Sequence, residues 1–535
     1  MYDLVVRNGH VMDGTGSPWY QADVAIKGEH VCAVERKMRT RGRREIDASE
    51  LVVAPGFIDM HAHSDATLLV NPRAESVICQ GITTQVVGQC GFSAAPVRSE
   101  QLEAFRRDSF VFSYTGYEWS WFDIDGYCEA LASVQPAINV ATLVGHGALR
   151  QYAMGQVTGP PNRQELALMK NELDRALGQG AVGLSSGLTY APGRFAEVGE
   201  LVELGHVVCQ HGGVYHTHMR DYARFLDESI RETIQVSEQA SVPANISHLF
   251  PAGPAYWGKA AVEATQTVDA ARRRGIDVTF DITPWTRGGG PYMQMLPDWA
   301  QEGGFASLRE RLADSQTRSR IAYQLENGLP DWKGWLPLDW HDQLICRTGA
   351  AKNASWIGRS IGELAQERGL PAAEMALLLL LEDEGQYWTA PTVKSQEDIN
   401  HILRHPVGIP ISDGMALAPY GPLYQPTNPR SYGTFPRVLG RYVREWGVLS
   451  LEAAVAKMTS MPAQRMGFLD RGLLRPGLCA DITVFDPTAV TDRETYQNSH
   501  AFPDGIAYVI VNGQLAVEHG RQSDVRCGKV LRSKR

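Results

Sequence analysis

The two ends of the chain share one pattern, in which apolar and polar residues alternate over short stretches. Near the N-terminus, residues 2–14 and 22–35 alternate in this way and contain Asn-Gly and Lys-Gly-Glu turns. The tail repeats the pattern in residues 480–486 and 506–520. Alternation with a period of two is typical of half-buried strands, and such turns are typical of hairpins. We therefore expect residues 1–53 and 477–535 to form one small β-sandwich domain built from both chain termini.

Between these ends, short apolar runs alternate with segments that have the period of a helix, such as residues 163–180 and 226–240. This alternation is typical of a parallel sheet whose strands are joined by helical crossovers. Eight runs can be counted, which is the number that a (β/α)8 TIM-like barrel needs: residues 51–54, 83–91, 137–147, 181–193, 212–221, 243–250, 276–285 and 407–414. We expect an α/β fold with this barrel in residues 54–476.

One segment interrupts the alternation between the seventh and eighth runs. Residues at about 296–369 are rich in tryptophan, charge and helix signals. Long inserted segments often cover an active site or determine its specificity. We expect an insertion here.

The composition argues against a nucleic-acid-binding, membrane or secreted protein. The 535 residues are 44% hydrophobic and carry a net charge of −9, which argues against nucleic acid or an anionic membrane as a partner. The eight cysteines show no C-x-x-C pair, the N-terminus lacks a signal-peptide pattern, and the apolar run at residues 375–381 is too short to span a bilayer. A cytoplasmic monomer or small homo-oligomer is expected.

Polar residues that ligate metals stand where several of the apolar runs end. His61 and His63 are separated by one residue, so on a strand both side chains point to the same face. The other runs supply Cys90, His218, His248 and Asp413. In a (β/α)8 barrel these strand ends meet at one face, and the mixed nitrogen, sulfur and oxygen set suits zinc. His216 precedes His218 by two residues, and we interpret it as a packed barrel residue.

These residue types predict a hydrolytic reaction. Zinc with an open coordination position lowers the pKa of its bound water to about 7 and polarises a carbonyl group. A carboxylate such as Asp413 can take the proton of that water and deliver it to a leaving amine. The reaction that this set favours is hydrolysis of an amide.

Eight motifs together identify a family resemblance. The chain contains PGFIDMHAHSD, QGITTQVVGQCGFSAAP, VGHGALR, GLSSGLTYAPG, HTHMRD, ISH, SDG and NPRSYGTFPRVL. This set resembles the N-acyl-D-amino-acid deacylases, the D-aminoacylase branch of the amidohydrolase superfamily. The resemblance implies a (β/α)8 barrel with a small β-sandwich, a tight zinc held by Cys90, His218 and His248, and a weaker metal position at His61 and His63 with Cys90 bridging. It implies that Asp413 is the general base and acid.

The same resemblance shows a change in the substrate pocket. Tyr190 and Arg430 match family positions associated with the substrate carboxylate, but Phe250 stands where the family commonly has a lysine. Trp285 replaces a tyrosine, so Phe250 and Trp285 are expected to form an aromatic wall. Arg287 could supply the missing charge, although an exposed loop arginine is the simpler interpretation. We expect a substrate that is bulkier, more aromatic or less dependent on a free carboxylate.

Three functions are compatible with these observations. The first is zinc-dependent hydrolysis of a linear amide of a small molecule, releasing an amine and a carboxylic acid. The second is a cyclic-amide or specialised-metabolite amidohydrolase on the same scaffold. The third is a non-catalytic scaffold protein, which we expect to have lost metal ligands; all six strand-end residues are present.

Overall fold

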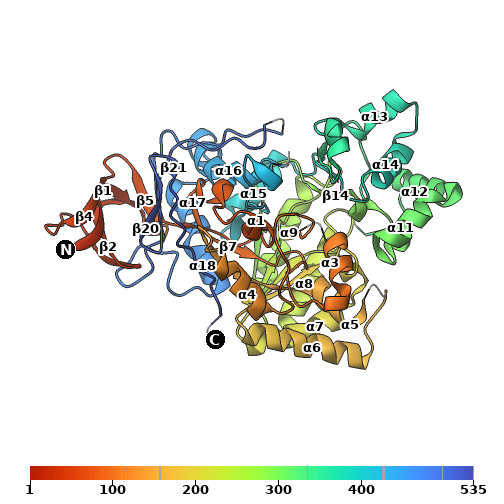
Figure 1. The fold of residues 1–535 in the computed structure, drawn as a ribbon, viewed down its shortest axis with the longest axis horizontal. Coiled ribbons are helices and arrows are strands. Elements are labelled where there is room, and N and C mark those ends of the chain that lie inside the picture. Colours follow the sequence, from red (N-terminus) through yellow and green to blue (C-terminus); the bar gives the residue numbers. More distant parts are fainter. Residues whose placement is uncertain (110, 156–157, 334, 425–427, 497, 534–535) are drawn as a thin grey trace.

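Strands from the two chain ends form one nine-stranded sheet. The computed structural model describes residues 1–535 except 110, 156–157, 334, 425–427, 497 and 534–535. The strand order is β21-β20-β19-β18-β5-β1-β2-β3, and β4 pairs with β1. In Figure 1 these red and dark blue strands lie together at the left. Their bounds are β1 Tyr2–Val11, β2 Tyr20–Lys27, β3 His30–Glu35, β4 Gly42–Asp47, β5 Val52–Pro55, β18 Ile482–Phe485, β19 Ile506–Val511, β20 Gln514–Glu518 and β21 Arg521–Gln522.

The central strands are parallel and form two hydrogen-bonded sets. One has the order β6-β7-β8 and the other β17-β13-β12-β11-β10-β9. Their bounds are β6 Phe57–Asp59, β7 Ile82–Val87, β8 Asn139–Thr142, β9 Val144–Gly145, β10 Gly183–Gly187, β11 Val214–His218, β12 Ala244–Ile246, β13 Val278–Ile282 and β17 Gly408–Pro410.

Backbone contacts join the two sets into the barrel. β8 continues almost directly into β9, with Leu143 between them. At the opposite edges, the amide of His63 donates to the carbonyl of Gly414 (2.7 Å). The amide of Asp413 donates to the carbonyl of His61 (3.0 Å). The first and last barrel strands therefore meet where three of the expected site residues, His61, His63 and Asp413, stand.

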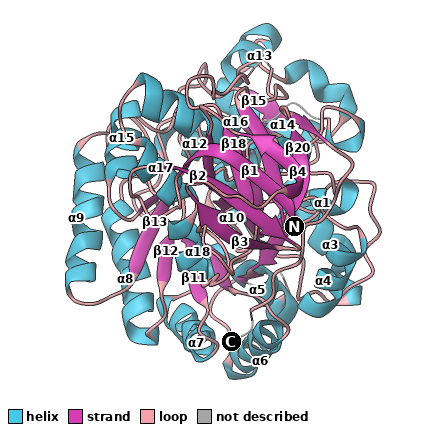
Figure 2. Ribbon diagram, turned by 90° about the vertical axis from the view of Figure 1, so that its left-hand side faces the viewer, coloured by secondary structure: helices cyan, strands magenta, loops and turns pink. Residues whose placement is uncertain are grey.

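Helices surround the barrel strands (Figure 2). In α6 (Arg163–Gly178), the buried residues Met169, Leu173, Ala176 and Leu177 recur at helical spacing, which gives one apolar face. Asn162 caps this helix, because its side chain accepts the amide of Glu165 while Glu165 accepts the amide of Asn162. The neighbouring helices along the chain are α7 Val198–Gln210, α8 Leu226–Ala240 and α9 Lys259–Arg273. The two predicted helix patterns are thus confirmed.

The first barrel strand differs from the expectation. The apolar run at residues 51–54 lies in β5, which pairs with β1 and β18 of the terminal sheet. The barrel begins one strand later, with β6, which pairs with β7. Gly56 separates β5 from β6, and its amide donates to the carbonyl of Asp481, so the chain changes sheet at this point.

A separate unit lies between β13 and β17 and is green at the upper right of Figure 1. It contains a three-stranded sheet and an apolar core of its own, so it is packed independently of the barrel. The segment expected at about 296–369 lies within it, and its role stays a prediction. Its main elements are β14 Gly290–Pro291, α10 Asp298–Gln301, α11 Gly304–Ala313, α12 Ser315–Asn327, β15 Ile345–Arg347, α13 Ile361–Arg368, α14 Ala372–Glu382 and β16 Trp388–Thr389.

The remaining helices flank the barrel: α1 Thr67–Val70, α2 Glu75–Ile78, α3 Leu102–Asp108, α4 Ile124–Ser133, α5 His146–Met154, α15 Gln396–Arg404, α16 Arg430–Arg437, α17 Leu451–Met458 and α18 Ser460–Met466. Among the described residues, no helix combines the length and apolar character needed to cross a bilayer.

A buried polar network joins the terminal sheet to the barrel. The Asp481 carboxylate accepts hydrogen bonds from Arg471 Nη1 (2.5 Å), Asn139 Nδ2 (3.0 Å) and the amide of Asn512 (2.7 Å). The Arg471 and Asp481 side chains are each 3% exposed. Removing Asp481 leaves the buried Arg471 guanidinium with one carboxylate partner, Asp470, whose side chain is 61% exposed.

We expect Asp481→Ala to lower the free energy of unfolding by about 3–5 kcal/mol, as measured by urea denaturation. Asp227→Ala is the matched control, because its ion pair with Arg231 is 56% and 66% exposed and spans one helical turn. That control is expected to change stability by less than about 1 kcal/mol. Equal losses in both variants would contradict a stabilising role for the buried network.

Candidate active site

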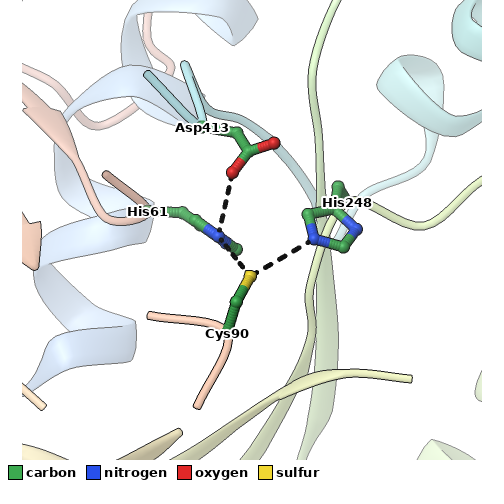
Figure 3. A group of neighbouring side chains, drawn as sticks. All are labelled: His61, Cys90, His248 and Asp413. Atoms are coloured by element: carbon green, nitrogen blue, oxygen red, sulfur yellow. Dashed lines mark hydrogen bonds and ion pairs between the residues drawn. The ribbon is translucent and has the colours of Figure 1, made fainter. Parts of the chain in front are cut away.

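Four metal-ligating side chains converge at one end of the barrel. The ligand atoms of His61, Cys90, His248 and Asp413 all lie within 4.8 Å of one another. Figure 3 shows these four side chains pointing toward a common centre. They follow β6, β7, β12 and β17, so four strand ends far apart in sequence supply one site. This is the face of a (β/α)8 barrel at which catalytic residues lie.

The contacts within the cluster are short. Cys90 Sγ lies 3.3 Å from His61 Nε2 and 3.5 Å from His248 Nε2. One oxygen of Asp413, Oδ1, lies 3.4 Å from His61 Nε2 and 3.1 Å from His63 Nε2. The other oxygen, Oδ2, pairs with Arg430 Nη1 at 2.8 Å. Asp413 therefore connects the cluster with a buried cation.

Three of these residues have a left-handed backbone. The φ angles are +54° at Cys90, +35° at His248 and +48° at Asp413. Residues other than glycine adopt such angles at a cost of order 1–3 kcal/mol, and they do so most often at functional sites. Each of the three follows the end of a strand, where the turn directs its side chain toward the centre of the barrel.

Two buried carboxylates hold these turns in place. Asp281, in β13, accepts the amide of His248 and the side chain of Asn245, and lies 3.5 Å from His61 Nδ1. Asp59, in β6, accepts the amide of Ser412 at 3.1 Å and also its hydroxyl group. The positions of His248 and Asp413 thus depend on neighbouring strands, which is a second layer of support that sequence reasoning missed.

The site combines two ionised acidic side chains with cationic neighbours. Burial opposes ionisation of Cys90, but the charge of His61 and hydrogen bonds from His218, His248 and His61 hold its pKa well below the ordinary value. Burial also opposes ionisation of Asp413, yet Arg430 and the two histidines hold the pKa of that carboxyl group well below its ordinary value. Burial lowers the pKa of His63, but hydrogen bonds with Asp413 and Cys90 and their charges raise it to about 9.

This donor set fits a zinc ion. It offers imidazole nitrogens, a thiolate and a carboxylate within one small volume, and Cys90 and Asp413 supply the negative charges that a cation needs. His218 lies beside the cluster, with its ring 4.5 Å from that of His248 and a hydrogen bond to Cys90. A thiolate already stabilised before metal binding is a ready ligand, because ligands must lose their protons to bind metal.

His216 lies apart from the cluster of ligand atoms. It is completely buried, and neither ring nitrogen has a hydrogen-bond partner among the described residues. Burial lowers the pKa of His216 to about 3, so the ring is neutral. This environment suits the expected packing role, which stays a prediction.

A cavity of about 660 Å3 opens above the cluster. Its lining includes Tyr190, Phe250 and Arg430, which the sequence singled out for substrate binding. Burial and the negative charges of Cys90 and Asp413 raise the pKa of Tyr190 well above its ordinary value, so its hydroxyl group stays protonated. Phe250 stacks on Tyr222 with ring centroids 5.0 Å apart, which gives this part of the cavity an aromatic wall.

Trp285 and Arg287 lie outside the described lining of this cavity. The indole of Trp285 donates to Thr434 and packs against the guanidinium of Arg437. Arg287 donates to Asp342 Oδ1 at 2.6 Å and to the carbonyl of Ala390 at 2.7 Å. The aromatic wall therefore contains Phe250 and Tyr222 rather than Trp285, and Arg287 holds loops together instead of facing the cluster.

Sequence reasoning missed three cationic residues that line the cavity, Arg194, Lys333 and Lys394, of which Lys394 is the most deeply buried. Lys394 lies in the loop between β16 and α15, is 2% exposed, and lines the same cavity as Asp413. Its neighbours in sequence, Thr-Val before it and Ser-Gln after it, show no motif. Only the fold brings this lysine to the site.

Comparisons with known proteins agree with this geometry. A model described as the amidohydrolase family matches residues 44–517. The chain is 34% identical to N-acyl-D-glutamate deacylase from Alcaligenes xylosoxydans xylosoxydans, covering 99% of this chain and 96% of that protein. It is 31% identical to D-aminoacylase from the same organism, covering 99% and 97%.

A solved structure gives the same result. The N-acyl-D-glutamate deacylase from Bordetella bronchiseptica, complexed with zinc and a phosphonate inhibitor, superposes with a TM-score of 0.83 at 30% identity, covering 99% of each chain. The family match spans most of the chain, and the site contains the metal-ligating side chains that such an enzyme requires. The chain therefore belongs to the amidohydrolase family and is a metal-dependent amide hydrolase.

Proposed function

We propose that this protein is a zinc-dependent deacylase that hydrolyses the linear amide of an N-acyl-D-amino acid and releases an amine and a carboxylic acid. The observation that carries the proposal is the cluster of His61, Cys90, His248 and Asp413 below a cavity that also contains Arg430. The similarity to N-acyl-D-glutamate deacylase and D-aminoacylase supports it.

The zinc ion, when bound, supplies Lewis-acid chemistry and an acidified water molecule. The protein residues then have separate roles. Asp413 is ionised at neutral pH, so it can accept the proton of the attacking water and pass it to the leaving nitrogen. Its bond with Arg430 fixes the orientation of the carboxylate. Tyr190 keeps its proton and can donate a hydrogen bond to the substrate.

Matched substrates test this function. Zinc-loaded protein is incubated with N-acyl amino acids that pair D with L, and free acid with carboxamide, together with a cyclic amide, and amine release is measured. We expect D substrates to exceed L substrates by about 100-fold or more in kcat/KM, because stereochemistry decides whether the acid group reaches its hydrogen-bond donors. Ring opening of the cyclic amide without deacylation would instead support the cyclic-amide alternative.

A further inference from the structure

The cavity contains four lysine or arginine side chains, and one differs from the others. Three form ion pairs with carboxylates: Arg194 with Asp298, Lys333 with Glu228 and Arg430 with Asp413. Lys394 has no ion pair with any described residue, although it is the most deeply buried of the four. The cavity therefore has one positive group that nothing in the described part of the chain neutralises.

The surroundings of Lys394 are poor in compensation. Its Nζ donates to the hydroxyl group of Thr283 and lies 4.9 Å from the centre of the Phe250 ring. Burial and the charge of Arg430 lower the pKa of Lys394 to about 7, against the opposing effect of Asp413. A buried ammonium group without a carboxylate partner is costly, and an anion bound in the cavity would lower that cost.

The loop that carries Lys394 is held from both sides. The amides of Val393 and Lys394 donate to the carbonyl of Thr286 at 3.1 and 3.0 Å. The carbonyl of Val393 accepts the amide of Gly253 (2.9 Å) and the indole of Trp257 (3.1 Å). The backbone on each side of the lysine is thus fixed to the chain after β12 and β13. A group held in place before binding loses little freedom when a ligand arrives.

We propose that Lys394 binds the carboxylate of the substrate and thereby gives the enzyme its preference for free acids over neutral amides. This inference rests on the proposed deacylase function. The family resemblance would imply a lysine at the position that Phe250 occupies in this chain. Here Phe250 cannot donate, yet its ring and Lys394 Nζ share one part of the cavity. The positive charge therefore enters this region from a different loop.

Substitution of Lys394 tests the proposal. We expect Lys394→Met to lower kcat/KM for an N-acyl-D-amino acid by about 10- to 100-fold, mainly through KM. The variant loses the hydrogen bond between the lysine and the charged carboxylate of the substrate. Turnover of the corresponding carboxamide should change by less than about 3-fold. Lys333→Met is the control, because this lysine lines the same cavity but is paired with Glu228 at 3.4 Å. An unchanged ratio of acid to carboxamide turnover in Lys394→Met would overturn the proposal.

A second variant excludes a structural explanation. Phe250→Lys in the Lys394→Met background should restore most of the preference for the acid, since it returns a cation to the same region from β12. The pH dependence of the acid-to-carboxamide ratio of the wild type is an independent measurement, because it does not depend on whether a variant folds. The groups facing Lys394 are Thr283, Phe250, Arg430 and Asp413; the pKa of Asp413 lies well below its ordinary value, whereas that of Lys394 is about 7. The acid-to-carboxamide ratio should fall as the pH rises through about 7, because the lysine loses its charge.

The outcomes separate the two proposals. Suppose that the wild type hydrolyses free acids, but that the acid-to-carboxamide ratio changes neither in Lys394→Met nor with pH. That result would overturn the role of Lys394 and leave the deacylase function standing. No turnover of any acid or carboxamide by zinc-loaded wild type would overturn the deacylase function, and the role of Lys394 with it.

Discussion

Replacing Asp413 with asparagine is expected to lower kcat by about 10²–10⁴-fold, the range that a positioned general acid–base group contributes. Asparagine has nearly the same shape, so the hydrogen bonds from His61 and His63 to one oxygen can persist. It cannot accept the proton of the attacking water. We expect KM to change much less than kcat, because the lost interaction belongs to the transition state.

Single-turnover and steady-state measurements on zinc-loaded Asp413→Asn would check this result, with zinc content and thermal unfolding measured on the same sample. Asp339→Asn is the control, because Asp339 is an exposed carboxylate that lines the same cavity. A variant that keeps its zinc, stays folded and retains kcat within a factor of three of wild type would show that another group moves the proton.

Replacing Cys90 with alanine is expected to remove the metal. The thiolate lies within 3.5 Å of two histidine nitrogens and is held ionised by them. Substitutions of residues that only support metal ligands typically cost 10–100-fold in metal affinity. Loss of the ligand itself should therefore weaken zinc binding by more than about 100-fold, and amide hydrolysis should disappear with it.

Metal analysis after equilibration with buffered zinc measures this effect directly. Cys128→Ala is the matched control, because Cys128 is equally buried (2% exposed) but lies in α4, away from the cluster. We expect that control to keep its zinc. If Cys90→Ala bound zinc as tightly as Cys128→Ala, the histidines and Asp413 alone would form the metal site.

Some of this site can be predicted from sequence because the barrel makes strand ends meet. His61, Cys90, His248 and Asp413 each follow an apolar run, and the fold rule that places such residues at one face brings them within 4.8 Å in the structure. The family resemblance selects Cys90 from eight cysteines, which spacing alone does not do. The roles assigned to these residues, and the domain boundaries at 53 and 477, stay predictions.

Other features depend on long-range packing. Arg287 and Trp285 follow β13 closely, yet their direction depends on Asp342 and Thr434, more than fifty residues away in sequence. Lys394 reaches the cavity only because the chain after the inserted unit returns beside Thr286. No local pattern encodes such a return. The placement of the first apolar run in the terminal sheet, and not in the barrel, likewise depends on the pairing of β5 with β18.

The sheet shared by the chain ends constrains how the protein is made. β5 lies between β1 and β18, so its second edge stays unpaired until β18, more than 400 residues later, has left the ribosome. Such an open edge is a template for association with other chains. Synthesis of β18 therefore closes this edge, and a chain terminated before β18 would keep it available for aggregation.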